Sequence, residues 1–209
     1  EHPNIIWLNE VIDDPKKDFI YLVTEYFSNG SLGDRVVAIN DKWKQYCLNE
    51  EIPYRPIGLK LKDARTYFIE MLKALYYCHK EVKVIHRDIK PENIMINHNN
   101  EAVLIDFGVS ALIEQQEDDK IEKNMGSQLF FAPEMFQRFR SKDNHVRGEK
   151  IDLWALGITL YYIVKGFYPF EAESAIELQY KVVNGDIDFS PILNTNLRNL
   201  LQRILEKDP

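Results

Sequence analysis

Apolar residues between positions 61 and 80 recur at the three- and four-residue spacing of an α-helix. This period predicts an amphipathic helix whose apolar stripe packs on a core. Asp63 and Glu70 lie on the other side of the same helix, where we expect them to be solvated. The residues of the predicted buried stripe are Leu61, Ala64, Phe68, Met71, Leu72, Leu75 and Cys78.

Residues 151–164 are apolar around nearly the whole circumference of a helix, interrupted only by Asp152 and Thr159. A helix without a polar face is predicted to be buried. It is too short to cross a bilayer, which takes about 20 apolar residues. Asp152 lies at its start, where the helix dipole favours a carboxylate.

The remaining pattern is shorter and more mixed. Residues 19–23 form an apolar run bounded by polar residues and are predicted to be a buried strand. Residues 28–31 have the composition of a turn. Residues 35–60 show no clean period and contain Pro53 and Pro56, which predicts a helix remnant followed by a loop. No role is assigned to this segment.

Two apolar runs, residues 94–97 and 102–105, flank a polar stretch and predict a β-hairpin. Pairing Asn97 with Ala102 would continue the ladder until Asn93 lies opposite Asp106. Directly opposed residues have Cβ atoms roughly 4.5–5.5 Å apart. The hairpin therefore predicts that an amide oxygen and a carboxylate meet at its open end, a ligand pair that suits magnesium.

Length and charge narrow the class of protein. A chain of 209 residues fits one domain, or one domain and part of another. The net charge of −7 and the lack of a Lys/Arg-rich block argue against nucleic-acid binding. Two cysteines give no disulfide framework. No secretory signal or membrane-spanning run is visible, so we expect a cytoplasmic protein without a membrane partner.

The strongest chemical signal is a set of three motifs in a fixed order. A lone Asp-Phe-Gly occurs by chance, whereas the full set in this order argues against a chance match. The set consists of His86-Arg87-Asp88-Ile89-Lys90-Pro91-Glu92-Asn93, then Asp106-Phe107-Gly108, then Ala132-Pro133-Glu134.

These motifs resemble the signature motifs of eukaryotic protein kinases, and the resemblance covers essentially the whole chain. It implies an α+β, protein-kinase-like fold, mostly the helical large lobe plus the last strands of the small lobe. Residues 1–27 would form the end of the small lobe and the hinge, and residues 28–209 the large lobe, truncated before its C-terminal end. The family's glycine-rich loop and strand lysine have no match, so we expect the chain alone to be inactive.

The resemblance implies ATP and Mg²⁺ as cofactors and gives the matched residues roles. Asp88 would accept or orient the proton of the acceptor hydroxyl, and Lys90 would place an ammonium beside the transferred phosphate. Asn93 and Asp106 would hold magnesium that bridges the phosphates. Without the family match, each of these residues alone would more often be a surface or turn residue.

The resemblance also implies a nucleotide-binding hinge. Thr24 matches the gatekeeper position, and the backbone groups of Glu25 and Phe27 would bind the adenine edge. Met95 is a further candidate nucleotide contact. The alternative for this segment alone is a strand that leads into a turn.

Other matched residues would support the site. His86 and Phe107 resemble members of the hydrophobic stack that aligns the two lobes, with Leu8 as a third member. Arg87 lies beside the catalytic aspartate. A general-base role for His86 is disfavoured, because the kinase template assigns the base to the aspartate.

Three residues further along the chain have both a family role and a simpler explanation. Ser127 resembles the residue that bonds the catalytic aspartate and lysine, or it is an ordinary loop serine. Glu134 matches a glutamate that pairs with an arginine beyond Pro209. Asp152 would anchor the backbone of the catalytic loop, a role we favour over that of a helix N-terminal charge.

Lys90 indicates a serine/threonine kinase. Residues 10–15, 106–110 and 126–134 are similar to calcium/calmodulin-dependent protein kinase kinases, and residues 166–170 to Lkb-like upstream kinases. Both families act on activation loops of other kinases, so the implied partner is a protein substrate, another kinase, with calmodulin possible through a segment outside this chain. Gln128 departs from the usual proline. The alternative function is a pseudokinase or scaffold that binds partners without phosphotransfer.

Overall fold

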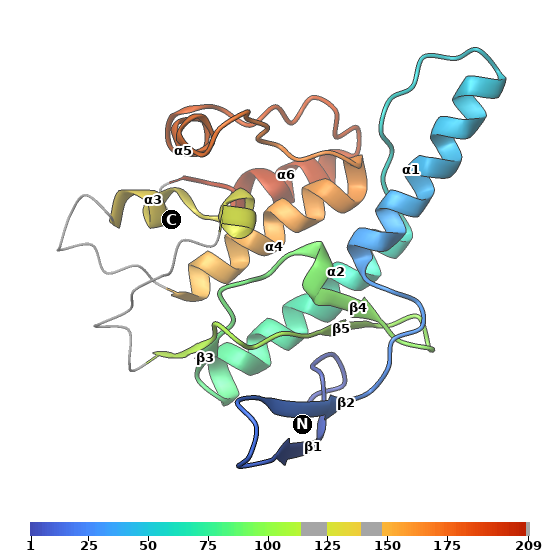
Figure 1. Ribbon diagram of the computed structural model, residues 1–209. Helices are drawn as coiled ribbons and strands as arrows, with labels where there is room; N and C mark the ends of the chain where they lie inside the picture. Colours follow the sequence, from blue (N-terminus) through green and yellow to red (C-terminus); the bar gives the residue numbers. More distant parts are fainter. Residues whose placement is uncertain (114–124, 139–147, 208–209) are drawn as a thin grey trace.

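The computed structural model describes residues 1–113, 125–138 and 148–207. Helices make up most of the body, and short two-stranded sheets lie on one side of it (Figure 1). The helices are α1 (Leu32–Asn49), α2 (Leu61–Tyr76), α3 (Pro133–Arg138), α4 (Gly148–Lys165), α5 (Ala175–Asn184) and α6 (Thr195–Ile204). The strands are β1 (Leu8–Asp13), β2 (Ile20–Thr24), β3 (Val84–Ile85), β4 (Ile94–Ile96), β5 (Ala102–Leu104) and β6 (Ala111–Leu112). Short segments of other helix types are η1 (Tyr77–Glu81, π-helical) and the 3₁₀-helices η2 (Pro91–Asn93) and η4 (Met125–Phe130).

Helix α4 forms the centre of the body, and the predicted burial of this helix is confirmed. It packs against α2 on one side and α6 on the other (Figure 1). Most of its apolar residues, among them Ile158 and Leu160, are almost fully buried. Gly157 allows α6 to approach closely, since a Cβ at this position would lie 2.6 Å from Cγ2 of Ile204.

Helix α2 confirms the predicted helical period but shifts its buried face. Ala64, Phe68, Met71, Leu75 and Cys78 are buried as predicted, and Tyr67 is buried with them. Leu61 and Leu72 were wrongly included, because 41% and 37% of their surfaces are exposed on the outer side of the helix.

Glu70 was wrongly placed in solvent. Its Oε2 accepts a hydrogen bond from the backbone N of Ala102 at 2.7 Å, so that α2 is tied to β5. Burial of this carboxyl raises its pKa above the ordinary glutamate value.

Helix α1 is longer than the predicted remnant. Ser31 and Asp34 form a capping box at its start, and Leu32, Val36 and Cys47 are buried. The helical spacing of apolar residues was hard to see in this segment. The distal part of α1 projects past the body (Figure 1) and buries few residues, so it needs no continuous apolar stripe. The following loop returns to the body, where the N of Leu59 donates to the carbonyl of Ile163 at 2.6 Å.

The hairpin β4–β5 forms, but its predicted register was wrong by one residue. Ile94 pairs with Leu104 and Ile96 with Ala102. The turn contains one residue fewer than predicted, because Asn97 pairs with Glu101 through its backbone N and accepts the N of Glu101 on its side chain. Residue 100 takes the left-handed conformation (φ 65°) that closes such a three-residue turn.

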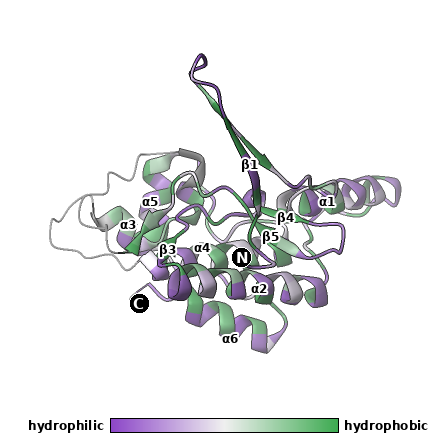
Figure 2. Cartoon of the chain, turned by 90° about the horizontal axis from the view of Figure 1, so that it is seen from below, coloured by the Kyte–Doolittle hydropathy of each residue, from purple (hydrophilic) through white to green (hydrophobic). Residues whose placement is uncertain are grey.

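The hairpin β1–β2 projects from the body (Figure 2), and the prediction of a buried strand at residues 19–23 was wrong. Every residue of β1 and β2 is exposed, because no layer of the described residues covers either face. The segment before it adds to the edge of β5, where the N of Ile6 donates to the carbonyl of Leu104 at 2.9 Å. None of the helices in the described part of the chain is long and apolar enough to cross a membrane.

Candidate active site

The backbone of residues 86–87 is fixed by a buried carboxylate on α4. Asp152 is fully buried, and its Oδ2 accepts the N of His86 at 2.9 Å while Oδ1 accepts the N of Arg87 at 2.8 Å. Arg87 has φ of 69°, a left-handed conformation that costs energy in a non-glycine residue. Two hydrogen bonds to one rigid carboxylate hold this conformation in place.

His79 also reaches Asp152, and the sequence analysis missed it. Its Nε2 lies 2.7 Å from Oδ2 of Asp152, and only 7% of its surface is exposed. His79 belongs to the π-helical turn η1, and π-helical turns are frequent at functional sites. The available signal was a histidine next to Cys78, at the end of the helix predicted to be amphipathic over residues 61–80.

Asp88 is the centre of a cluster of polar side chains at the end of this loop. Nζ of Lys90 lies 2.5 Å from Oδ2 of Asp88, and Nδ2 of Asn93 donates to the same oxygen at 2.8 Å. Nδ2 of Asn93 also donates to the backbone carbonyl of Asp88 at 2.9 Å. Because the amide nitrogen is used in this way, the Oδ1 atom of Asn93 is left to bind a cation.

Asp106 lies next to this cluster. The N of Ile105 donates to the carbonyl of Asn93 at 3.0 Å, so the corrected register puts Asn93 beside Ile105, with Asp106 as the next residue. Asp106 has φ of 62°, and its Oδ1 accepts the N of Gly108 at 3.2 Å. The chain therefore turns sharply where the carboxylate emerges.

The side-chain oxygens of Asn93 and Asp106 would fit magnesium that is bound together with a nucleotide. They supply one carboxylate and one amide oxygen, the small set of hard ligands that magnesium takes when phosphates and water complete its octahedron. Among the described residues no three His, Cys, Asp or Glu side chains gather as an all-protein metal site would require.

His86 is occupied by structural contacts at both ring nitrogens. Its Nδ1 accepts the N of Asp88 at 3.3 Å, and its Nε2 donates to the carbonyl of Ile105 at 2.9 Å. The ring meets Phe107 edge to face at 4.7 Å. Burial lowers the pKa of His86, which favours the neutral ring. Leu8, the expected third member of this stack, is 44% exposed.

The predicted nucleotide contacts lie at the junction of hairpin and body. Thr24 ends β2, and its Oγ1 donates to the carbonyl of Glu25 at 3.3 Å. Glu25 is exposed and Phe27 is partly buried. Met95 in β4 forms an isolated antiparallel bridge with Ser31, which brings it close to the end of this segment.

Comparison with known proteins supplies the family. The sequence model described as "Protein kinase domain" matches residues 1–209. The chain belongs to the protein kinase domain family. The protein kinase fold therefore accounts for the helical body, its central buried helix and the short hairpin β4–β5.

Similar proteins include several serine/threonine kinases. Serine/threonine-protein kinase ssp1 of Schizosaccharomyces pombe is 36% identical over the whole chain, which spans 30% of that protein. GRIK2 of Arabidopsis thaliana is 35% identical, with 46% of its length covered. CBL-interacting protein kinase 5 of Oryza sativa subsp. japonica is 33% identical, with 40% covered. The chain thus spans less than half the length of these relatives.

Two further kinase positions lie near α3 and η4. The side chain of Ser127 is outside the described residues. Glu134 lies in the first turn of α3 and lines a small pocket together with Trp154 and Arg203. Burial raises the pKa of Glu134, and the nearby Lys150 opposes this shift. Nε1 of Trp154 is buried and has no hydrogen-bond partner in the described part of the chain.

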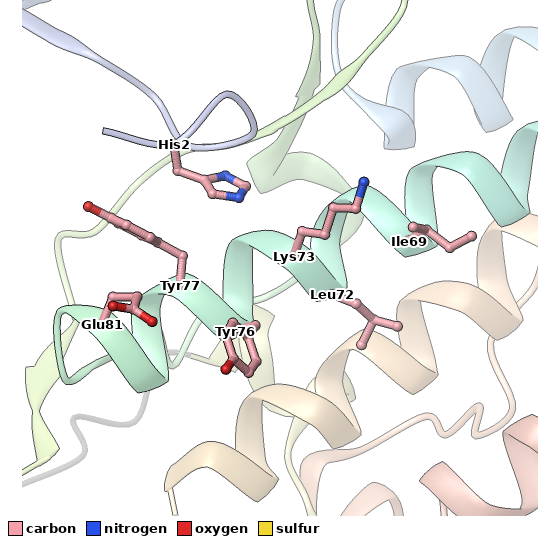
Figure 3. Close-up of a pocket in the computed structure, with 7 residues that line it drawn as sticks. All are labelled: His2, Ile69, Leu72, Lys73, Tyr76, Tyr77 and Glu81. Atoms are coloured by element: carbon pink, nitrogen blue, oxygen red, sulfur yellow. The ribbon is translucent and has the colours of Figure 1, made fainter.

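A groove on the outer side of α2 is separate from this active site. Figure 3 shows that α2 and η1 supply most of its wall, and that the N-terminal segment lies above them. None of its residues belongs to the kinase motifs. They are His2, Ile69, Leu72, Lys73, Tyr76, Tyr77 and Glu81.

Proposed function

We propose that this chain is the catalytic part of an ATP- and Mg²⁺-dependent protein serine/threonine kinase. The observation that carries the proposal is the cluster of Lys90 and Asn93 on the carboxylate of Asp88. Phosphoryl transfer needs positioning and charge neutralisation more than covalent chemistry, and this cluster offers both.

Each residue of the cluster would have a distinct task. Asp88 would orient the acceptor hydroxyl and take its proton, while Lys90 would hold an ammonium against the transferred phosphate. Oδ1 of Asn93 and the carboxylate of Asp106 would hold magnesium. Bound magnesium would neutralise charge on the phosphate oxygens. His79 and Asp152 would act through the backbone, by keeping the loop in the conformation that presents Asp88.

We further propose that the substrate is the activation loop of another kinase. The support comes from the resemblance of residues 126–134 and 166–170 to upstream kinases. These two segments also touch each other, since the ring of Phe130 meets that of Tyr168 edge to face at 5.7 Å. Tyr168 in turn stacks on Tyr162 of α4 at 4.4 Å. The substrate-facing segment is thereby connected to the rigid centre of the body.

The test uses the full-length protein with labelled ATP and excess magnesium. Matched peptides carry Ser, Thr or Tyr at one position, and catalytically inactive kinase domains serve as protein substrates. We expect label on Ser or Thr and on an activation loop, and loss of transfer in Asp106→Asn because an amide is a weaker magnesium ligand than a carboxylate. Label on Tyr alone would contradict the acceptor class. Nucleotide binding without transfer would favour a pseudokinase or scaffold.

A further inference from the structure

Helix α2 has a second apolar row, on the side that faces away from the body. Ile69, Leu72 and Tyr76 follow one another at the three- and four-residue spacing of a helix face, and 39%, 37% and 64% of their surfaces are exposed. The buried stripe of α2 lies on the opposite side, so this row contributes little to the core. Large apolar residues that are exposed and in register indicate a contact surface.

The apolar row forms the floor of the groove on the outer side of α2. The N-terminal segment lies over α2 and brings His2 to the edge of the groove (Figure 3). The ring of His2 lies 5.3 Å from that of Tyr77, and the two form a wall. The groove has a volume of about 490 Å³, which is enough space to receive large side chains of an approaching segment.

Positive charges border the apolar row along three turns of α2. Lys62, Arg65 and Lys73 are exposed, and none of them takes part in an ion pair in the described part of the chain. The two acidic residues of α2, Asp63 and Glu70, lie on a neighbouring face of the helix. The whole chain has a net charge of −7, so this basic border differs from the rest of the molecule.

We infer that the outer face of α2 is a docking site for an acidic, amphipathic helical segment of another protein. A helix laid along the groove would place the apolar residues of one face on the apolar row and its carboxylates opposite the basic border. The inference goes beyond the proposed function, because it concerns a partner and not the phosphorylated hydroxyl. The outer face of α2 is defined as Lys62, Arg65, Ile69, Leu72, Lys73 and Tyr76.

The groove favours a protein segment over an anionic lipid surface. A lipid surface has no side chains that would fill a hollow, whereas a helix in a groove is held by apolar anchors at this spacing. Glu81 lines the groove as well, and its carboxylate repels anionic lipids. None of the groove residues belongs to the motifs around Asp88, so an occupied groove would tether a partner without changing the chemical step.

The test measures binding of a labelled synthetic peptide to the full-length protein by fluorescence polarisation. The peptide is helical, with leucine and phenylalanine along one face and glutamate at the flanking positions. One control peptide has lysine in place of each glutamate, and a second has serine in place of each apolar residue. We expect binding of the first peptide alone, with an affinity that falls as salt is added.

Two matched pairs of substitutions locate the binding site. Lys73→Glu and Tyr76→Ala change the groove, whereas the controls Lys44→Glu and Leu48→Ala change exposed positions of α1. Leu48 is 66% exposed, close to the 64% of Tyr76. We expect Kd to rise about tenfold or more in both groove variants and to stay parental in both controls, with parental melting temperatures throughout. The lysine-containing peptide should regain affinity for Lys73→Glu.

Four results would overturn the docking site. They are a parental Kd in both groove variants, an equal loss of affinity in the α1 controls, tighter binding of the lysine-containing peptide to the parent, and no peptide binding by the full-length protein. Sedimentation with phosphatidylserine vesicles tests the lipid alternative. Vesicle binding that is lost in Lys73→Glu, without peptide binding, would assign the face to a membrane and contradict a protein partner. All of these measurements are independent of phosphate transfer.

Discussion

Two antiparallel hairpins of this chain have opposite surroundings. The strands of β4–β5 are almost entirely buried, and they pack against α1 and α2. The strands of β1–β2 are exposed along their whole length. A two-stranded hairpin is marginal in water on its own, so each needs a cover. The comparison shows that β4–β5, the hairpin between Asn93 and Asp106, is positioned by packing against helices, whereas β1–β2 is exposed along both strands.

The exposed hairpin has the composition of a core element. Ile12, Ile20 and Leu22 are between 44% and 65% exposed, although such residues are usually buried. Apolar surface of this extent marks a contact surface. The resemblance to protein kinases implies that this hairpin is the end of a small lobe. We therefore expect nucleotide binding to depend on a cover over β1–β2, while the catalytic loop is already assembled in the body.

The largest expected effect follows from this difference. Purified residues 1–209 should fold cooperatively but transfer no phosphate above background, whereas the full-length protein transfers it. The body holds the loop around Asp88, but the segment that covers the phosphates in protein kinases has no match here. Circular dichroism and a labelled-ATP assay measure both properties. Turnover by residues 1–209 at the full-length rate would show that the exposed hairpin needs no cover.

A matched pair of substitutions measures the two hairpins directly. Ile94 in β4 is fully buried, whereas Ile20 in β2 is 57% exposed. In residues 1–209, Ile94→Ala should lower the free energy of unfolding by about 2–5 kcal/mol, because it leaves a cavity. Ile20→Ala should change it by no more than about 0.5 kcal/mol. Urea unfolding monitored by tryptophan fluorescence gives both values. Similar losses of stability at the two sites would contradict the claim that only β4–β5 is stabilised by packing against the body.

The smallest expected effect is on how the free energy of unfolding depends on pH. Burial lowers the pKa of His86 below the ordinary value of 6.5. As pH falls below 6.5, the unfolded chain takes up a proton that the folded protein refuses until its lower pKa is reached, so stability decreases in that window. One group contributes at most about 1.4 kcal/mol per pH unit. Urea unfolding between pH 7.5 and 5.5 should show a shallower slope for His86→Gln, and an unchanged slope would contradict this role.

Most of the fold could be predicted from local hydrophobic patterns and from the sequence motifs. The period of α2 and the apolar circumference of α4 were readable because each helix buries a long stripe. The register of β4–β5 was not, because a turn closed by the side chain of Asn97 is one residue shorter than the polar stretch suggests. The burial of β2 was predicted wrongly. Its apolar composition favours burial, but the local sequence does not show whether another element packs on the strand.

The sequence predicted the motif residues of the candidate site and Asp152 as the anchor of the loop backbone, but it did not predict that His79 also contacts Asp152. Asp88, Asn93 and Asp106 are named by motifs that are contiguous in sequence. His79 reaches Asp152 across 73 positions, and this contact depends on how η1 turns the end of α2. No local pattern encodes such a pairing. Glu70 was taken as solvated for the same reason, since its partner, Ala102, lies on a different element.

The most direct test of the account is the chemical step of Asp88→Asn in the full-length protein. Asparagine keeps the shape of the side chain and can still contact Lys90 and Asn93 through its oxygen, but it cannot take up the acceptor proton. Single-turnover phosphotransfer should slow by about 10²–10⁴-fold, with ATP affinity unchanged. A parental single-turnover rate in Asp88→Asn would contradict the claim that this cluster performs phosphoryl transfer.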